Sequence, residues 1–233
     1  MKRIVSVLLI LTLSLPPLAL AAQFAQSPRF HSDARPKKVL LLKPQMLVAE
    51  LSAGGVVQRM EDWSKQASDN LLQATRQYAR DSALFETLDP PELSPQTEDL
   101  VASHLGLYDL VAGAVFQFGQ NSGPDAWADR RTAWEYTLGD GLKALAEQTG
   151  ADAALVFVGA DYISTSGRKA AFVAGLLLGV GIPLGMSFVS AGLVDLKTGD
   201  IEWMSFDSSS TMDTREPKKV QGLVKDLFEK YPR

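Results

Sequence analysis

Hydrophobic and polar side chains alternate on both sides of a short polar link in the last quarter of the chain. The first alternating run covers residues 187–195 and the second covers 201–207. Gly199, in the link between them, can adopt the positive φ that a tight turn needs. The pattern therefore predicts a β-hairpin whose return strand carries enough apolar mass to lie in a core. The residues on which this hairpin depends are Asp195, Thr198, Gly199 and Trp203.

Other patterns along the chain predict an α/β (α+β) fold. Short apolar runs at 39–42 and 153–158 are typical of buried strands. Apolar side chains spaced three and four apart predict amphipathic helices at 61–78 and 132–149. We therefore expect a mixed β-sheet with helices packed on it, in a single domain over 38–233. Further predicted elements are a strand near 46–51, a strand at 84–88, a short helix at 95–107 and a C-terminal helix from residue 216.

The first residues of the chain have the pattern of a secretory signal peptide. Lys2 and Arg3 precede an apolar run at 4–15, and an Ala-Leu-Ala cleavage site ends at Ala21. A membrane anchor is disfavoured, because the run is shorter than the roughly 20 residues that span a bilayer. We predict a signal peptide over 1–21 that is cleaved after Ala21.

Composition then indicates where the mature chain resides. The polar segment 22–37 is predicted to be a flexible mature N-terminus. The chain has no cysteine, which is common in a bacterial periplasm and excludes both thiolate metal sites and a lipidated cysteine. Loss of Lys2 and Arg3 changes the net charge from −4 to −6. Because basic residues are scattered, we expect no nucleic-acid partner. We predict a periplasmic protein.

Residues 170–194 contain no charged side chain over twenty-five positions. Such a length permits a transmembrane helix, although Pro183 and several glycines disfavour one. A second interpretation is an apolar loop or short helix followed by a buried strand. A third makes the Gly-rich part, 170–186, a contact site for a membrane or a protein partner, because exposed apolar patches mark contacts. The expected contact residues are Phe172, Leu176, Leu177, Leu178, Val180 and Ile182.

Candidate chemistry is sparse, and we predict neither a catalytic, a metal nor a cofactor site. Gly179–Gly185 approximates a dinucleotide-binding loop, but its spacing is one residue too long and Pro183 interrupts it. The chain has two histidines, and His31 lies in the predicted flexible segment. A periplasmic hydrolase would therefore have to rely on His104. That hydrolase and a small-ligand carrier remain the alternative functions.

Two short patches resemble a known family. After a predicted helix comes Gly150-Ala-Asp and a strand, and the hairpin reads Leu-Val-Asp-x-x-Thr-Gly-x-x-x-Trp. Together they resemble the α/β domain shared by the TolB amino-terminal domain and CsgG-like bacterial envelope proteins. The resemblance implies a mixed sheet with helices packed on it and a non-enzymatic role in assembly, scaffolding or secretion. It also implies an envelope protein or a second copy of the chain as partner, and no catalytic residues.

Overall fold

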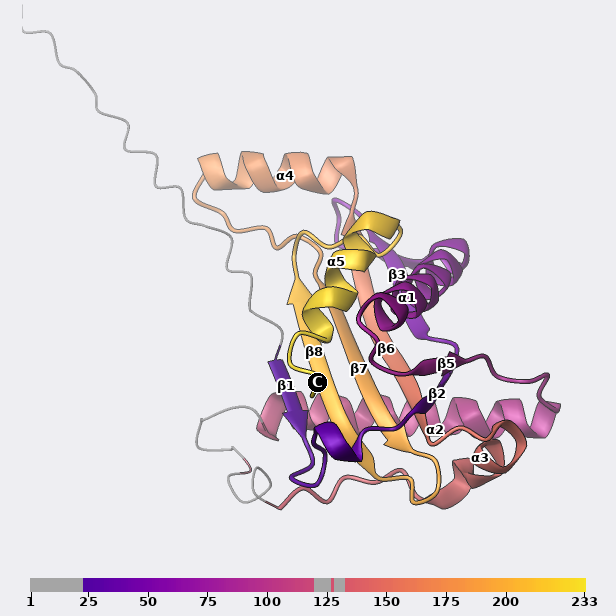
Figure 1. The fold of residues 1–233 in the computed structure, drawn as a ribbon. Coiled ribbons are helices and arrows are strands. Elements are labelled where there is room, and N and C mark those ends of the chain that lie inside the picture. The colour runs from indigo at the N-terminus through magenta and orange to yellow at the C-terminus, as the bar shows by residue number, and fades with distance from the viewer. Residues whose placement is uncertain (1–22, 120–126, 128–132) are drawn as a thin grey trace, which may run out of the picture.

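An eight-stranded mixed sheet forms the centre of the protein, with helices packed on it in a single α/β domain (Figure 1). The computed structural model describes residues 23–119, 127 and 133–233. The predicted signal peptide lies outside these described residues. The strands are β1 (Gln23–Gln26), β2 (Lys38–Leu41), β3 (Gln45–Leu51), β4 (Val57–Arg59), β5 (Glu86–Leu88), β6 (Ala153–Ser164), β7 (Ser187–Asp195) and β8 (Ile201–Ser209).

Five α-helices are present within the described ranges. They are α1 (Glu61–Asp81), α2 (Pro95–Ala114), α3 (Lys143–Thr149), α4 (Ser166–Leu177) and α5 (Pro217–Leu227). Short helical turns occur at η1 (Ser32–Ala34), η2 (Val115–Gly119) and η4 (Asp140–Leu142). The α2 helix and the η2 turn together extend well beyond the short helix predicted at 95–107.

The sheet is built around β6, its longest strand at 12 residues. One edge of β6 pairs antiparallel with β7. Its other edge pairs in parallel with β2 near its start and with β3 toward its end. The strand order is β1-β8-β7-β6-β2-β5, with β3 on β6 and β4 on β3. A single strand therefore joins both halves of the sheet.

The predicted hairpin is present as β7 and β8. Gly199 has a φ of 76°, which glycine adopts without steric cost. The Asp195 carboxylate accepts hydrogen bonds from the backbone N–H groups of Lys197 and Thr198, at 2.7 and 2.9 Å. Trp203 is fully buried and its ring stacks on Phe228 with centroids 5.2 Å apart. The turn chemistry and the apolar return strand thus act as the sequence pattern indicates.

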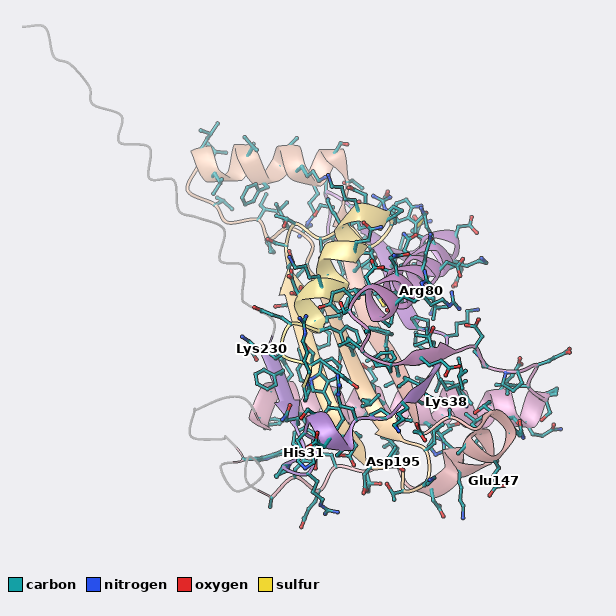
Figure 2. All side chains as sticks on the ribbon, in the orientation of Figure 1. His31, Lys38, Arg80, Glu147, Asp195 and Lys230 are labelled. Carbon is teal, nitrogen blue, oxygen red and sulfur yellow. The ribbon has the colours of Figure 1, made fainter. Side chains whose placement is uncertain are left out.

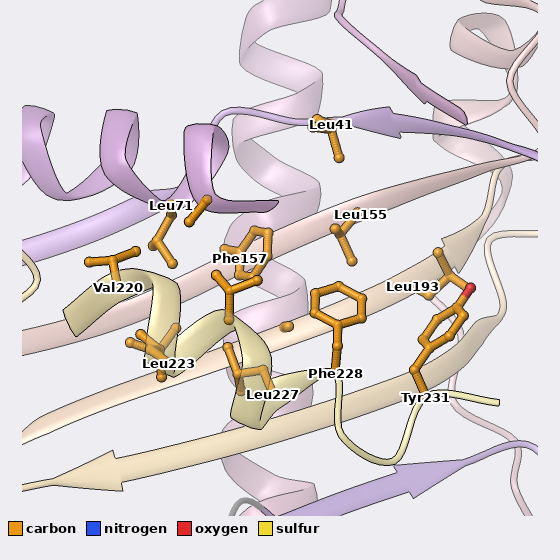
Figure 3. Packing of buried hydrophobic residues seen from close by; sticks show 14 of the residues in the cluster. Leu41, Leu71, Leu155, Phe157, Leu193, Val220, Leu223, Leu227, Phe228 and Tyr231 are labelled. Atoms are coloured by element: carbon orange, nitrogen blue, oxygen red, sulfur yellow. The ribbon is translucent and has the colours of Figure 1, made fainter. Parts of the chain in front are cut away.

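Alternate residues along each strand point into two separate cores. Val39 and Leu41 face α1 and α5, whereas Leu40 and Leu42 face α2 and α3. Figure 3 shows the first core, where Leu223 and Phe228 approach side chains of the sheet. Most of the sheet is therefore covered on both faces, which explains the continuous apolar runs of β2 and β6.

Helix prediction is wrong for the first part of 132–149. Residues 133–139 form no helix, and Thr137 forms a β-bridge with Asp200 of the hairpin turn. The indole N–H of Trp134 donates to a backbone carbonyl of β8. Gly139, with a φ of 76°, separates this segment from η4 and α3. Contacts with the hairpin outweigh the helical spacing of the apolar residues.

The flexible segment predicted at 22–37 also differs from the structure. Residues 23–26 form β1, which pairs antiparallel with β8. Phe30 is buried in the first core, with its ring 5.5 Å from that of Tyr231. Pairing with β1 satisfies backbone groups that would otherwise lie on an open sheet edge. The prediction of flexibility is wrong for this part of the segment.

The stretch Pro95–Gly119 is long and apolar enough to cross a membrane by length and composition alone. Its Val101, Leu105 and Tyr108 side chains are buried in the second core against the sheet. The Tyr108 hydroxyl lies 2.7 Å from the Ser190 hydroxyl of β7. In this fold, the stretch is therefore a helix packed against the sheet.

Gly192→Ala should destabilise the fold, because a Cβ at residue 192 would overlap the Tyr108 ring. Overpacking of this kind lowers the free energy of unfolding by about 1–3 kcal/mol. Gly222→Ala on α5 is the matched control, because a Cβ there meets no atom within 4 Å. The control should be neutral or stabilising by up to about 1 kcal/mol. Urea unfolding of both variants measures the difference, and equal midpoints would contradict the prediction.

Candidate interaction site

Helix α4 starts two residues after β6 and runs outward from the end of the sheet (Figure 1). Thr165 caps it, since its hydroxyl accepts the backbone N–H of Arg168 at 3.1 Å. The helix ends before Gly179, which has a φ of 72°. Only Arg168 and Gly175 of its twelve residues are buried. Figure 2 shows side chains projecting from both sides of it.

We call residues 170–186 the apolar arm. Leu177 and Leu178 are 85% and 80% exposed, although both are large aliphatic side chains. Phe172 and Ile182 are half-buried, and Ile182 packs beside Gly175. The six exposed large apolar side chains of the arm are Val173, Leu176, Leu177, Leu178, Val180 and Met186. Four of the six predicted contact residues are therefore exposed, while a transmembrane helix over 170–194 is wrong because β7 begins at residue 187.

We call the place where the arm joins the end of β6 its root, and Arg168 fastens the arm there. This side chain is 7% exposed and donates to the Pro183 carbonyl at 2.9 Å and to the Ser52 carbonyl at 3.1 Å. The N–H of Gly185 donates to the Ser164 hydroxyl at 2.8 Å. Gly185 approaches the Tyr162 carbonyl so closely that no Cβ would fit. Both ends of the arm are thus held against the end of β6. The sequence pattern does not identify Arg168, because its role depends on contacts between segments that are far apart in the chain.

A second exposed apolar segment adjoins the root of the arm. Val56, in the turn between β3 and β4, is 66% exposed, and Val57, the first residue of β4, is 52% exposed. This segment is joined to the arm by the Arg168–Ser52 bond and by the Thr165 N–H, which donates to the Leu51 carbonyl at 3.0 Å. Together, 52–57 and the apolar arm form what we call the apolar end. It carries eight of the thirteen exposed large apolar side chains in the described residues.

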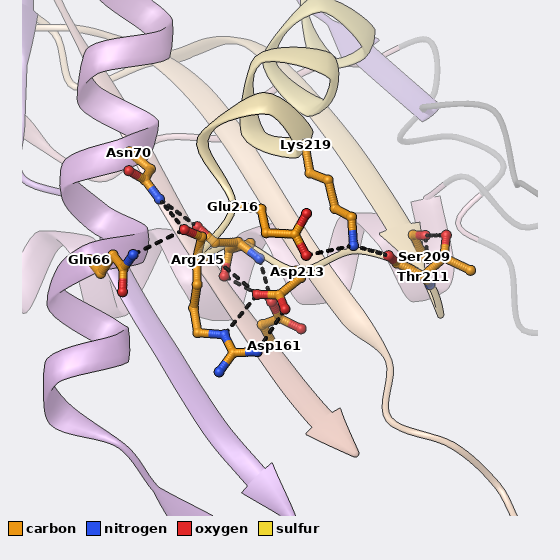
Figure 4. Close-up of polar contacts among 10 residues, drawn as sticks. Gln66, Asn70, Asp161, Ser209, Thr211, Asp213, Arg215, Glu216 and Lys219 are labelled. Atoms are coloured by element: carbon orange, nitrogen blue, oxygen red, sulfur yellow. Dashed lines mark hydrogen bonds and ion pairs between the residues drawn. The ribbon is translucent and has the colours of Figure 1, made fainter. Parts of the chain in front are cut away.

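A buried polar network lies close to the root of the arm (Figure 4). Asp161 of β6 is 1% exposed and accepts both the N–H and the hydroxyl of Thr214, each at 2.8 Å. Arg215 pairs with Asp213 at 2.7 Å, and its guanidinium lies 4.1 Å from the centre of the Trp63 ring. These contacts fix the segment between β8 and α5 against β6 and α1.

The network shifts the pKa values of two carboxyl groups in opposite directions. Burial raises the pKa of Asp161, because charge is disfavoured away from water. Hydrogen bonds from the Arg215 side chain lower the pKa of Asp213. Asp161 accepts two hydrogen bonds from Thr214 and thereby holds the segment between β8 and α5 against β6.

His104, the residue on which the hydrolase alternative depends, lies on α2. Its Nδ1 is 2.8 Å from the Leu100 carbonyl of the same helix, and this is its hydrogen-bond partner among the described residues. No serine or aspartate within those residues hydrogen-bonds its ring. In the same described part, no group of three or more His, Asp or Glu side chains could hold a metal ion.

A cleft of about 690 Å³ lies beside β3 on the surface of the sheet. Met46, Tyr162 and Phe188 provide its apolar lining, while Lys43 and Asp109 contribute charge. Desolvation raises the pKa of Asp109. The volume of the cleft falls within the range of about 300–1,000 Å³ that is typical of small-molecule sites.

Comparisons with known proteins give only distant structural matches. No protein-family model matches the chain, and no curated protein matches it in sequence. Among solved structures, the PelC dodecamer from Paraburkholderia phytofirmans has 12% identity and a TM-score of 0.39, covering 91% of this chain and 97% of its own. Lipoprotein GNA1162 from Neisseria meningitidis has 15% identity and a TM-score of 0.32, covering 75% and 80%. We infer no function from similarities at this level, and the TolB and CsgG resemblance remains a prediction.

Arg168→Ala should loosen the arm while leaving the sheet intact. The loss of two charge-assisted hydrogen bonds should lower stability by about 1–3 kcal/mol. Hydrogen exchange should become faster in residues 166–186 and stay slow in β6 and β7. Lys169→Ala is the control, because Lys169 is exposed one position away. Unchanged exchange in the arm of the Arg168→Ala protein would show that Arg168 does not fasten it.

The raised pKa of Asp161 predicts a pH-dependent effect of Asp161→Asn. The folded chain binds this proton more tightly than the unfolded chain, so the contribution to stability is present at low pH and is lost as pH rises through the folded-state pKa. The Tm of Asp161→Asn relative to wild type should therefore rise as the pH increases above about 4, the ordinary pKa of an aspartic acid. Asp213 is present in both proteins, so the effect of its titration on stability largely cancels in the Tm difference.

Asp161→Ala is the companion variant, because it removes the acceptor of both Thr214 hydrogen bonds. It should be less stable than Asp161→Asn by about 1–3 kcal/mol at every pH, because neither variant titrates at this position. Thermal melts across the pH range compare the three proteins. A Tm difference between Asp161→Asn and wild type that does not change with pH would rule out the raised pKa.

Proposed function

We propose that this chain is an exported protein of the bacterial envelope that carries out no chemistry of its own. It acts in assembly, scaffolding or secretion by making contact through its apolar end. The observation that carries this proposal is the apolar arm, fastened at its root by Arg168 and exposed along most of its length. The predicted signal peptide and the lack of cysteine support the periplasmic location.

Exposure of the arm has a free-energy cost that supports a role in binding. Burying a leucine side chain stabilises a protein by about 1.5–3 kcal/mol relative to leaving it exposed. Leu176, Leu177 and Leu178 are all exposed in the isolated chain. Exposed side chains scattered singly need no explanation, whereas a contiguous apolar patch usually marks an interaction site. A partner that covers the apolar end would recover this free energy.

A small-ligand carrier is the second candidate, favoured by the cleft of about 690 Å³ beside β3. Native mass spectrometry of the purified protein tests it, because a carrier would show a retained mass that denaturation removes. The hydrolase alternative lacks comparable support, since the described hydrogen bond of His104 stays within α2. Unchanged activity of His104→Ala in a hydrolase screen would remove that alternative.

Leu177→Glu/Leu178→Glu should abolish contact through the apolar end without unfolding the protein. Both side chains are exposed, so the variant should keep its stability within about 0.5 kcal/mol. Tagged wild-type protein should cofractionate with an envelope component or with itself, and the double variant should lose this association. Leu110→Glu is the matched control, because Leu110 is 73% exposed on α2, outside the apolar end.

Cell fractionation and an intact mass complete that test. All three proteins should be exported with the mass expected for cleavage after Ala21. A protein retained in the cytoplasm with its N-terminus uncleaved would refute the envelope assignment. Equal association of the double variant and wild type would refute the role of the apolar end.

A further inference from the structure

The apolar arm lacks the polar side that a helix seated in a protein groove presents to water. Beyond Lys169, the remainder of α4 consists of alanine, phenylalanine, valine, glycine and leucine. Val173, Leu176 and Leu177 are exposed and, at spacings of three and four, lie together on one face of the helix. A helix that is apolar all round is typical of burial within a protein or of contact with lipid. No polar side chain follows Lys169 in α4, so none would face water at the edge of a bound protein. An apolar layer that excludes water from the exposed face of the helix therefore fits it better than a protein groove.

A second copy of the chain offers poor complementarity in its clefts. The cleft beside β3 is lined by Lys43, Arg59, Glu61, Lys65 and Asp109. Two other clefts, of about 540 and 490 Å³, share Arg35 and Lys37 and carry further charges. The arm has no charged side chain to pair with any of these groups. Docking the arm there would desolvate charges without compensation, which is unfavourable.

We propose that the apolar end enters one leaflet of a lipid bilayer. This inference rests on the proposed function, since it names the partner of the same surface. Helix α4 has 12 residues and a length of about 18 Å, compared with about 30 Å for the apolar layer of a bilayer. The arm is therefore too short to span the membrane, but it can insert into the outer part of one leaflet. Exposed Lys169 at its root can remain at the level of the headgroups.

The turn between β3 and β4 gives this contact a second point of attachment. Val56 and Val57 are exposed next to the root of the arm, where Arg168 binds the Ser52 carbonyl. Two apolar segments joined in this way would fix the orientation of the sheet relative to the bilayer. A single mobile anchor would leave that orientation free.

The absence of cysteine allows a direct test with site-specific labels. Leu177→Cys and Leu110→Cys of the mature protein are each labelled with an environment-sensitive nitrobenzoxadiazole fluorophore. Vesicles of phosphatidylethanolamine and phosphatidylglycerol are then added. The label at 177 should brighten, shift to shorter wavelength and be quenched by lipids spin-labelled near the headgroup. The label at 110, where the side chain is also mostly exposed but lies on another part of the surface, should not respond.

Vesicle flotation of unlabelled proteins provides the matched binding measurement. Leu177→Glu/Leu178→Glu should reduce the partition coefficient by about tenfold or more, because a carboxylate is strongly disfavoured in the apolar layer. Val57→Glu should reduce it to a smaller extent, and Leu110→Glu should leave it unchanged. Circular dichroism confirms that each variant is folded.

Three results would overturn the inference. The label at 177 could remain unchanged with vesicles, or the labels at 177 and 110 could respond equally. Alternatively, the fluorescence of the label at 177 could shift to shorter wavelength without lipid as the protein concentration rises, while light scattering shows a higher molar mass of the protein. That last result would assign the apolar end to a second copy of the chain and leave the proposed function standing. If the wild-type protein bound vesicles but did not associate with any envelope component in cells, that result would instead contradict the proposed function.

Discussion

The fold depends on the backbone pairing of β6 along both of its edges. This strand pairs with β7 on one side and with β2 and then β3 on the other. It also ends next to α4, so the same strand that joins the two halves of the sheet supports the apolar arm. A change of register by one residue would turn Leu155 and Phe157 away from the core that they share with α1 and α5. Correct pairing of β6 is therefore required for the core and for the position of the arm.

Rigidity at the root is what distinguishes the arm from an ordinary exposed loop. Arg168 binds two carbonyls from segments far apart in sequence, and Gly185 fits against the end of β6 where no larger residue could. The buried contacts of Asp161 with Thr214 stabilise the neighbouring segment before α5. Polar interactions thus hold an apolar surface in the solvent. Their free energy compensates for part of the cost of exposing several leucines.

This division of roles supports the proposal that the molecule acts by contact through its apolar end. Polar groups of the described network are satisfied within the fold, as the bonds of Asp161 and the ion pair of Arg215 illustrate. Most of the exposed large apolar side chains in the described residues, eight of thirteen, gather at the apolar end. Such a surface offers free energy of desolvation and little chemical selectivity. Selectivity would then come from the shape of the arm and from the charge of Lys169 at its root.

The sequence by itself determined the elements whose signals are local. Alternation and turn chemistry were sufficient for the β7–β8 hairpin, since Gly199 and Asp195 act within their own turn. The spacing of apolar residues was sufficient for α1 and α5, whose buried faces follow the helical period. The stretch without charge was also visible directly in the sequence, together with most of the residues that prove to be exposed in it.

Only the tertiary structure decided what covers each apolar segment. Pro95–Gly119 and the apolar arm are both rich in apolar residues, yet the first packs against the sheet and the second projects from it. Residues 133–139 form no helix and 23–26 form a strand because the hairpin provides them with backbone partners. Apolar content specifies that a segment avoids water, but the neighbour that excludes the water comes from distant parts of the chain. For the same reason, Arg168 could be recognised as the fastening of the arm only once Ser52 and Pro183 were brought beside it.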